Sequence, residues 1–176
     1  SETVLTRMFQ NYRIKQNRST MSSGIITYRP FKLDDLPAMV ELGRQMHAES
    51  NYSHLDYDPA KLDLMAATWL ANPEIYFADI AICENKIFAM YVGFISEYYF
   101  GKDLVANDCL LFVDKSKRGG VAAIRLIKRF QQWAFDKGAS EVRPATSTGV
   151  QTEDTKKLYE ALGYDTVGYV FRKCKL

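Results

Sequence analysis

The chain has 176 residues, of which 47% are hydrophobic and 25% are charged. This size and composition predict one soluble globular domain with a full core. The first 20 residues carry four basic and one acidic side chain, so residues 21–176 hold 19 basic against 20 acidic ones, or −1 of the total +2. A nearly neutral domain disfavours nucleic acid as the main partner.

The longest apolar region, 75–95, is interrupted at Glu84, Asn85 and Lys86, which predicts a hairpin and no membrane span. The three cysteines are Cys83, Cys109 and Cys174, an odd number without CxxC spacing. We interpret them as reduced thiols of a cytoplasmic protein, with Cys83 and Cys109 in buried strands. The two histidines lack metal-ligand spacing, so no metal is expected.

Residues 1–24 are set apart from the rest. They carry Leu5, Met8, Phe9 and Tyr12 at helical spacing and precede Met21, itself a possible start. A leader, a processed segment and a swapped arm all fit this pattern, and a targeting peptide is the less favoured interpretation. We therefore expect one domain over 25–176.

Hydrophobic periodicity then predicts an alternation of strands and helices. The expected strands cover 25–29, 76–83, 86–97, 109–113 and 141–147, with a final strand from Tyr164. The expected helices cover 33–46, 59–70, the amphipathic stretch after Gly120, and 153–162.

Residues 107–130 are the most informative segment, because an apolar strand runs through a basic, glycine-containing turn into an amphipathic helix. Lys115, Lys117 and Arg118 surround Gly119 and Gly120. Free backbone N–H groups at such a helix N-terminus bind pyrophosphate well. Taken alone, a Gly-Gly pair before a helix is more often a simple turn. The segment also matches neither GxxxxGK[ST] nor GxGxxG.

Four segments in order make the pattern more specific. They read YRPFKLDDLPAMVEL, NKIFAMYVGFI, LFVDKSKRGGVAA and TKKLYEALGY. Together they resemble the GNAT superfamily of acetyl-CoA-dependent N-acetyltransferases over residues 25–176. The resemblance implies an α/β GNAT fold, in which a mixed central sheet of about six strands is flanked by about four helices.

The resemblance also implies where acetyl-CoA binds. The family loop reads Gln/Arg-x-x-Gly-x-Gly/Ala, and an ungapped alignment puts Arg118 first, Val121 at the usual first glycine and Ala123 last. This register keeps Leu126 and Ile127 on the buried helix face. Val121 is a departure that bears on how tightly the pyrophosphate is held, although the backbone donors remain. The implied cofactor-binding residues are Phe112, Val113, Arg118, Gly119, Gly120, Val121, Ala122 and Ala123.

Acetyl transfer to an amine needs alignment of the amine with the thioester, a proton acceptor, and a proton donor for the departing thiolate. The resemblance implies that Tyr159 is the donor, whereas helical periodicity alone favours a core tyrosine. Asp108 and Glu97, at strand ends, are the candidate bases, and both residues are more often plain solvated carboxylates. Ser147 and Thr148 offer hydroxyls to substrate or cofactor, or form an ordinary turn.

The acceptor is expected to be a primary amine of a small molecule or protein. Two aromatic-rich loops, 46–58 and 98–106, would shape its site as the resemblance implies. Nearby Glu49, Asp56, Asp58 and Glu97 would suit a cationic amine or a peptide N-terminus; packing of the aromatic rings under long loops is an equal alternative. A non-catalytic acyl-CoA-binding or protein-interaction module stays open as the alternative function, and a homodimer is possible.

Overall fold

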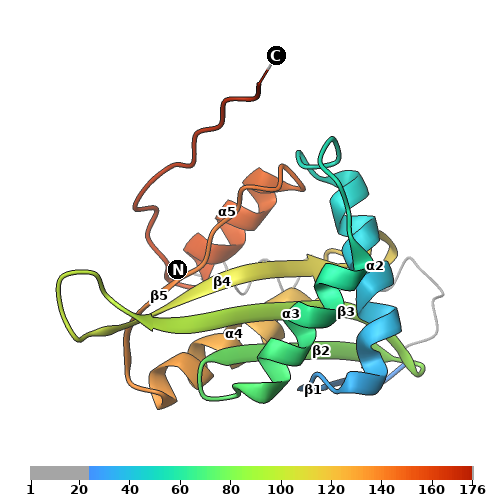
Figure 1. Ribbon diagram of the computed structural model, residues 1–176, viewed down its shortest axis with the longest axis horizontal. Helices are drawn as coiled ribbons and strands as arrows, with labels where there is room; N and C mark the ends of the chain where they lie inside the picture. Colours follow the sequence, from blue (N-terminus) through green and yellow to red (C-terminus); the bar gives the residue numbers. More distant parts are fainter. Residues whose placement is uncertain (1–23, 176) are drawn as a thin grey trace, which may run out of the picture.

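The computed structural model describes residues 24–175; the expected N-terminal leader or arm, 1–24, falls almost wholly outside them. Figure 1 shows one mixed sheet with helices on both faces. The strands are β1 (Ile26–Pro30), β2 (Tyr76–Cys83), β3 (Lys86–Glu97), β4 (Leu104–Val113) and β5 (Ala139–Arg143). The α-helices are α2 (Leu36–Glu49), α3 (Pro59–Ala71), α4 (Ala122–Asp136) and α5 (Thr152–Ala161), with 3₁₀-helices η1 (Leu33–Asp35) and η2 (Lys115–Lys117).

The sheet has the strand order β1-β2-β3-β4-β5, antiparallel except for the last, parallel pair. β2 and β3 begin and end where the sequence predicts, because Glu84 and Asn85 both take the left-handed conformation (φ 51° and 61°) that a two-residue hairpin turn requires. Both strands are largely buried, as expected for strands covered on two faces.

Helix α4 covers one face of the sheet, and α2 and α3 cover the other (Figure 1). Leu126, Ile127, Phe130 and Ala134 on α4 are fully buried, which confirms the helix register that the sequence predicts. Burying such an apolar stripe, at about 25 cal/mol per Å² of apolar surface, holds the helix against the sheet.

The described residues contain five strands rather than about six, and the final strand expected from Tyr164 is not formed. Gly163 (φ 90°) ends the turn after α5, and the chain then leaves the sheet. Val167, Tyr169 and Phe171 alternate as in a strand but are 82–91% exposed. Local β-propensity predicted a strand here, but a strand also needs an edge to pair with.

Strand boundaries shift by one or two residues at β1 and at the start of β5, and two boundaries differ from expectation by four residues or more. β4 begins at Leu104 instead of 109, because the polar residues Asn107 and Asp108 still pair with β3. β5 ends at Arg143 instead of 147, because Pro144 has no N–H to continue the ladder. Both shifts determine where the sheet opens.

Candidate active site

The sheet splits where β4 and β5 diverge. Their parallel pairing runs from Leu104↔Ala139 only to Asn107↔Arg143. From Asp108 onward, β4 is paired with β3 alone, so its other edge is open within the described residues. An open strand edge offers a row of backbone donors and acceptors to an extended ligand.

A bulge marks the start of this open edge. Gly93 pairs with Asp108 and Val92 with Leu110, which leaves Cys109 as the extra residue. Bulges bend a strand and redirect its side chains. Cys109 is therefore exposed, and the prediction that it is a buried core thiol is wrong. Gly93 is required opposite the bulge, because a Cβ there would lie 2.4 Å from the Phe130 ring.

The backbone groups on the open edge can be assigned from the ladder. Asp114 N donates to Phe88 O at 2.7 Å, so Asp114 and Phe112 direct their backbone groups toward β3. The alternate residues Leu111 and Val113 direct theirs to the open edge. Val113 is one of the cofactor-binding residues that the resemblance implies, and Leu111 is a second residue whose backbone groups face the open edge.

The turn after β4 presents a cluster of free amides. Asp114 accepts hydrogen bonds from the Ser116 N–H and hydroxyl (2.8 and 2.6 Å), which shapes η2. Gly119 then takes φ 80°, where a side chain would be strained. The first bond of α4 is from Arg125 N to Val121 O, and the N–H groups of residues 119–124 make no hydrogen bond within 24–175. Together with the helix dipole, free donors of this kind are suited to bind an anion.

Arg118 has partners within the protein instead of facing this turn freely. Its guanidinium donates to both carboxylate oxygens of Glu49 at the end of α2, at 2.7 and 3.0 Å, and its Nε donates to Val113 O at 2.9 Å. The guanidinium also lies 5.2 Å from the centroid of the buried Phe112 ring. Arg118 therefore fastens the loop to α2, and the amides are left as the donors for an anion.

A cluster of polar groups lies inside the split, formed by Tyr91 of β3, Asp108 of β4 and Tyr159 of α5. The hydroxyls of Tyr91 and Tyr159 are buried and near each other, and neither makes a hydrogen bond of good geometry among residues 24–175. Buried hydroxyls without a partner are rare and call for an explanation. Burial raises the pKa of both phenols above the ordinary value, and the Asp108 carboxylate adds to the rise. Both phenols thus stay protonated at neutral pH.

Asp108 is the first residue beyond the β4–β5 pairing. Its Oδ1 accepts the Ala145 N–H at 2.9 Å, which ties β4 to the chain after β5. Burial raises the pKa of its carboxyl from 3.8 to about 6, although the Ala145 bond opposes that rise. A carboxyl that titrates near neutral pH inside a cleft is a candidate general base.

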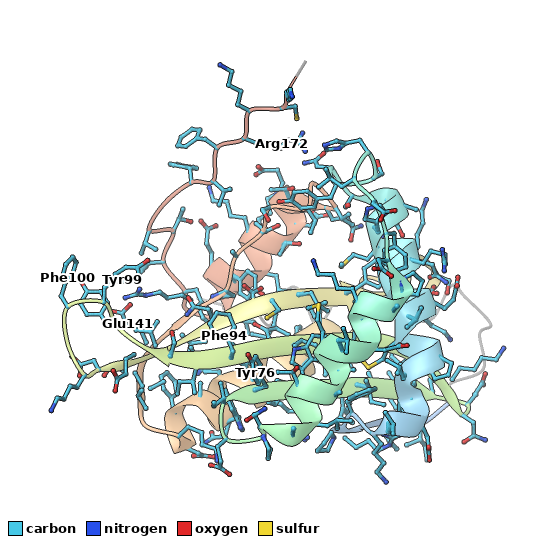
Figure 2. The ribbon with its side chains drawn as sticks, in the orientation of Figure 1. Tyr76, Phe94, Tyr99, Phe100, Glu141 and Arg172 are labelled. Carbon is cyan, nitrogen blue, oxygen red and sulfur yellow. The ribbon has the colours of Figure 1, made fainter. Side chains whose placement is uncertain are left out.

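Glu97 does not join this cluster. It pairs with Leu104 near the tip of the β3–β4 hairpin and is exposed. It lies four residues along the strand from Gly93, the partner of Asp108, which is roughly 13 Å. Figure 2 shows that tip, where Tyr99 and Phe100 point into solvent.

The loop after α2 and the segment after β5 are hydrogen-bonded to each other beside the split, so the Ser147 hydroxyl already has a partner. The Tyr52 hydroxyl bonds to Ser147 Oγ at 3.0 Å, and Asn51 N donates to Thr148 O at 2.7 Å. Arg172 of the C-terminal segment donates to Asn51 O at 2.6 Å (Figure 2). The loop after α2 is thus held to the segment after β5.

Sequence reasoning missed Tyr91 and Leu111 as parts of this site, and it assigned Glu49 to the acceptor, whereas Glu49 accepts hydrogen bonds from Arg118. Tyr91 is a fully buried residue of a long apolar strand, so no local signal separated it from the core. The role of Leu111 follows from an open edge that only the strand pairing reveals.

Within residues 24–175 no helix is long and apolar enough to cross a membrane. The same residues contain no group of three or more His, Cys, Asp or Glu side chains placed to hold a metal ion.

No family model matches the sequence, and the comparison with curated proteins gives no match. Solved structures do match. Glucosamine-6-phosphate N-acetyltransferase from Arabidopsis thaliana is 16% identical, with TM-score 0.70, over 85% of this chain and 98% of its own. AAC(6′)-Iy, in complex with a CoA-containing bisubstrate analogue, is 20% identical, with TM-score 0.67, over 86% and 99%. A transcriptional regulator from Bacillus halodurans C-125 is 18% identical, with TM-score 0.69, over 86% and 100%.

At these identities the likeness establishes the fold. The chain has the α/β fold of the GNAT acetyltransferases, as the sequence resemblance implies.

Proposed function

We propose that the protein is an acetyl-CoA-dependent N-acetyltransferase that moves an acetyl group to a primary amine by direct attack on the thioester. The observation that carries this proposal is that an anion-binding turn and a buried polar cluster lie at the two ends of the same open strand edge. The free amides of residues 119–124 lie at one end of the open part of β4, and the Asp108–Tyr159 cluster lies at the other. Solved structures with this fold, including one with a CoA-containing analogue, support it.

The proposed binding site fits the cofactor by its chemistry. The amides and the dipole of α4 suit the pyrophosphate, and they act without any side chain, so Val121 in place of glycine removes no donor. The outward backbone groups of Leu111 and the outward N–H of Val113 suit the amides of an extended pantetheine arm, whereas Val113 O already accepts from Arg118. The thioester would then reach the bulge at Cys109, beside the polar cluster.

Each residue of the cluster has one proposed task. Asp108, ionised above pH about 6, takes the proton of the attacking amine directly or through water. The amine nitrogen bonds to the thioester carbonyl carbon, and the carbon–sulfur bond breaks. Tyr159 gives its proton to the leaving thiolate, and the proton that Asp108 took from the amine then restores the Tyr159 phenol, with the Tyr91 hydroxyl as the proposed relay.

The binding half of this proposal is tested at Val121, the N-cap of α4. Val121→Asp places a negative charge at the helix N-terminus, which favours the helix but repels a pyrophosphate. We expect acetyl-CoA binding in calorimetry to weaken by roughly tenfold or more, while the melting temperature stays level or rises. The matched neutral variant, Val121→Asn, should bind acetyl-CoA nearly as the parent does. Equal binding by both variants would place the cofactor elsewhere.

The catalytic half is tested by thiol release from acetyl-CoA with a panel of primary amines. Binding of acetyl-CoA without turnover on any amine would favour a non-catalytic acyl-CoA-binding protein. That alternative is in keeping with the regulator that shares the fold.

A further inference from the structure

A cavity of about 140 Å³ lies under α2 and α3, on the sheet face opposite α4. Leu110 of β4 lines it next to the bulge, and Thr148 lines it from the segment after β5. Both residues belong to the segments on either side of the split between β4 and β5, so the cavity lies on the α2 side of the proposed thioester position. Further lining residues include Val40, Met46, Tyr57 and Trp69.

The cavity wall is apolar in its chemistry, even where polar residues line it. The Tyr57 hydroxyl donates to Val40 O at 2.6 Å, the Ser50 hydroxyl to His47 O at 2.9 Å, and the Tyr52 hydroxyl bonds to Ser147. These hydroxyls therefore already have hydrogen-bond partners within the protein. Of the residues that line the cavity, one has a buried side-chain polar atom without a partner among residues 24–175, the Nε2 of His47.

The carboxylates once expected to hold a cationic acceptor are not in this wall. Glu49 is bound to Arg118, Asp58 caps α3 by accepting from Ala60 N, and Glu97 lies at the far hairpin. Among the residues that the structure describes, no Asp or Glu lines the cavity. An acceptor with a second positive charge would therefore lose solvation here without gaining a counter-charge.

We infer that this cavity binds the side group of the acceptor and selects primary amines that carry one compact apolar group. This inference rests on the proposed function and names the acceptor class of the same site. An apolar protein cavity of about 150 Å³ holds a benzene molecule. The upper limit on the side group is therefore about one ring or a short branched chain.

The first test measures binding without turnover. Methionine methyl groups are labelled with ¹³C, and benzylamine is titrated into the full chain. The signals of Met39, Met46 and Met90, which line the cavity, should shift together and saturate. Met65, which is exposed on α3 and does not line it, should not shift. Absence of a saturable shift at the three lining methionines would overturn the inference.

The second test measures kcat/KM for methylamine, isobutylamine, benzylamine and spermidine. Each methylene buried in the cavity should raise kcat/KM by about fourfold, or about 50-fold between methylamine and isobutylamine. Spermidine should be the poorest acceptor. Equal rates on all four amines, or a preference for spermidine, would overturn the inference.

Matched variants on α2 assign the preference to the cavity. Val40→Phe fills it and should lower kcat/KM for isobutylamine at least about tenfold, with methylamine within about twofold. Ala48→Phe puts the same ring on the exposed side of α2 and should change neither. If the Val40 variant keeps the isobutylamine preference, the side group binds elsewhere.

The two proposals fail in different ways. Loss of the proposed function would appear as no acetyl-CoA binding in calorimetry and no thiol release with any amine. The methionine titration would still report whether the cavity binds an apolar amine. If kcat/KM does not depend on the side group of the amine, the protein is still an acetyltransferase, but the cavity does not bind the acceptor.

Discussion

Replacing Asp108 with asparagine is expected to make the protein more stable and less active at the same time. Burial raises the pKa of the Asp108 carboxyl from 3.8 to about 6. Above that pH the folded protein therefore holds a charge that its surroundings disfavour. Two pKa units correspond to about 3 kcal/mol of unfolding free energy.

The sign of the effect follows from the direction of the shift. A raised carboxyl pKa favours the folded state at low pH, and this stabilisation is lost as the pH rises from about 4 to about 6. Asparagine has the same shape, stays neutral, and can still accept the Ala145 N–H. The gain in stability should thus be about 3 kcal/mol at pH 8 and roughly half of that at pH 5. At pH 8 it corresponds to a melting temperature higher by about 6–12 °C.

The assay combines unfolding at pH 5 and pH 8 with acetyl transfer at pH 8. Loss of the base should lower kcat/KM by roughly 100- to 10,000-fold and remove the inflection near pH 6 from the pH profile. Asp63→Asn, at an exposed site on α3, is the control and should change neither quantity. A variant that is less stable at pH 8, or equally stabilised at both pH values, would refute the reasoning.

Tyr159→Phe removes a buried hydroxyl that has no well-formed hydrogen bond among residues 24–175, so the melting temperature should stay the same or rise. The kcat should fall roughly 10- to 1000-fold. Turnover equal to that of the parent protein would show that Tyr159 is not the proton donor. Arg118→Glu breaks the bonds to Glu49 and Val113 O, so both acetyl-CoA affinity and stability should fall, the latter by roughly 1–3 kcal/mol in urea unfolding. An unchanged urea midpoint would show that the pair does not fasten the loop. A chain that begins at Gly24 should keep its melting temperature and acetyl-CoA affinity, because the five strands of the described residues lie within 26–143. A drop of more than a few degrees would mean that the removed segment packs on the domain.

The sequence by itself determined the elements whose signals are local. Turn chemistry at Glu84 and Asn85 and the apolar runs on either side defined the β2–β3 hairpin to the residue. The three- and four-residue spacing of Leu126, Ile127 and Phe130 defined the buried face of α4. The order of four short motifs was enough to indicate the fold.

The tertiary structure alone decided which groups meet. Strand 104–113 crosses two polar residues because β3 pairs with them, and the apolar segment from Val167 stays exposed because no edge pairs with it. The Arg118 guanidinium, which the loop sequence suggested for a phosphate, instead pairs with Glu49, 69 residues away in sequence. The pKa of Asp108 depends on burial at the point where two strands diverge, a property of packing that no single segment of the sequence contains.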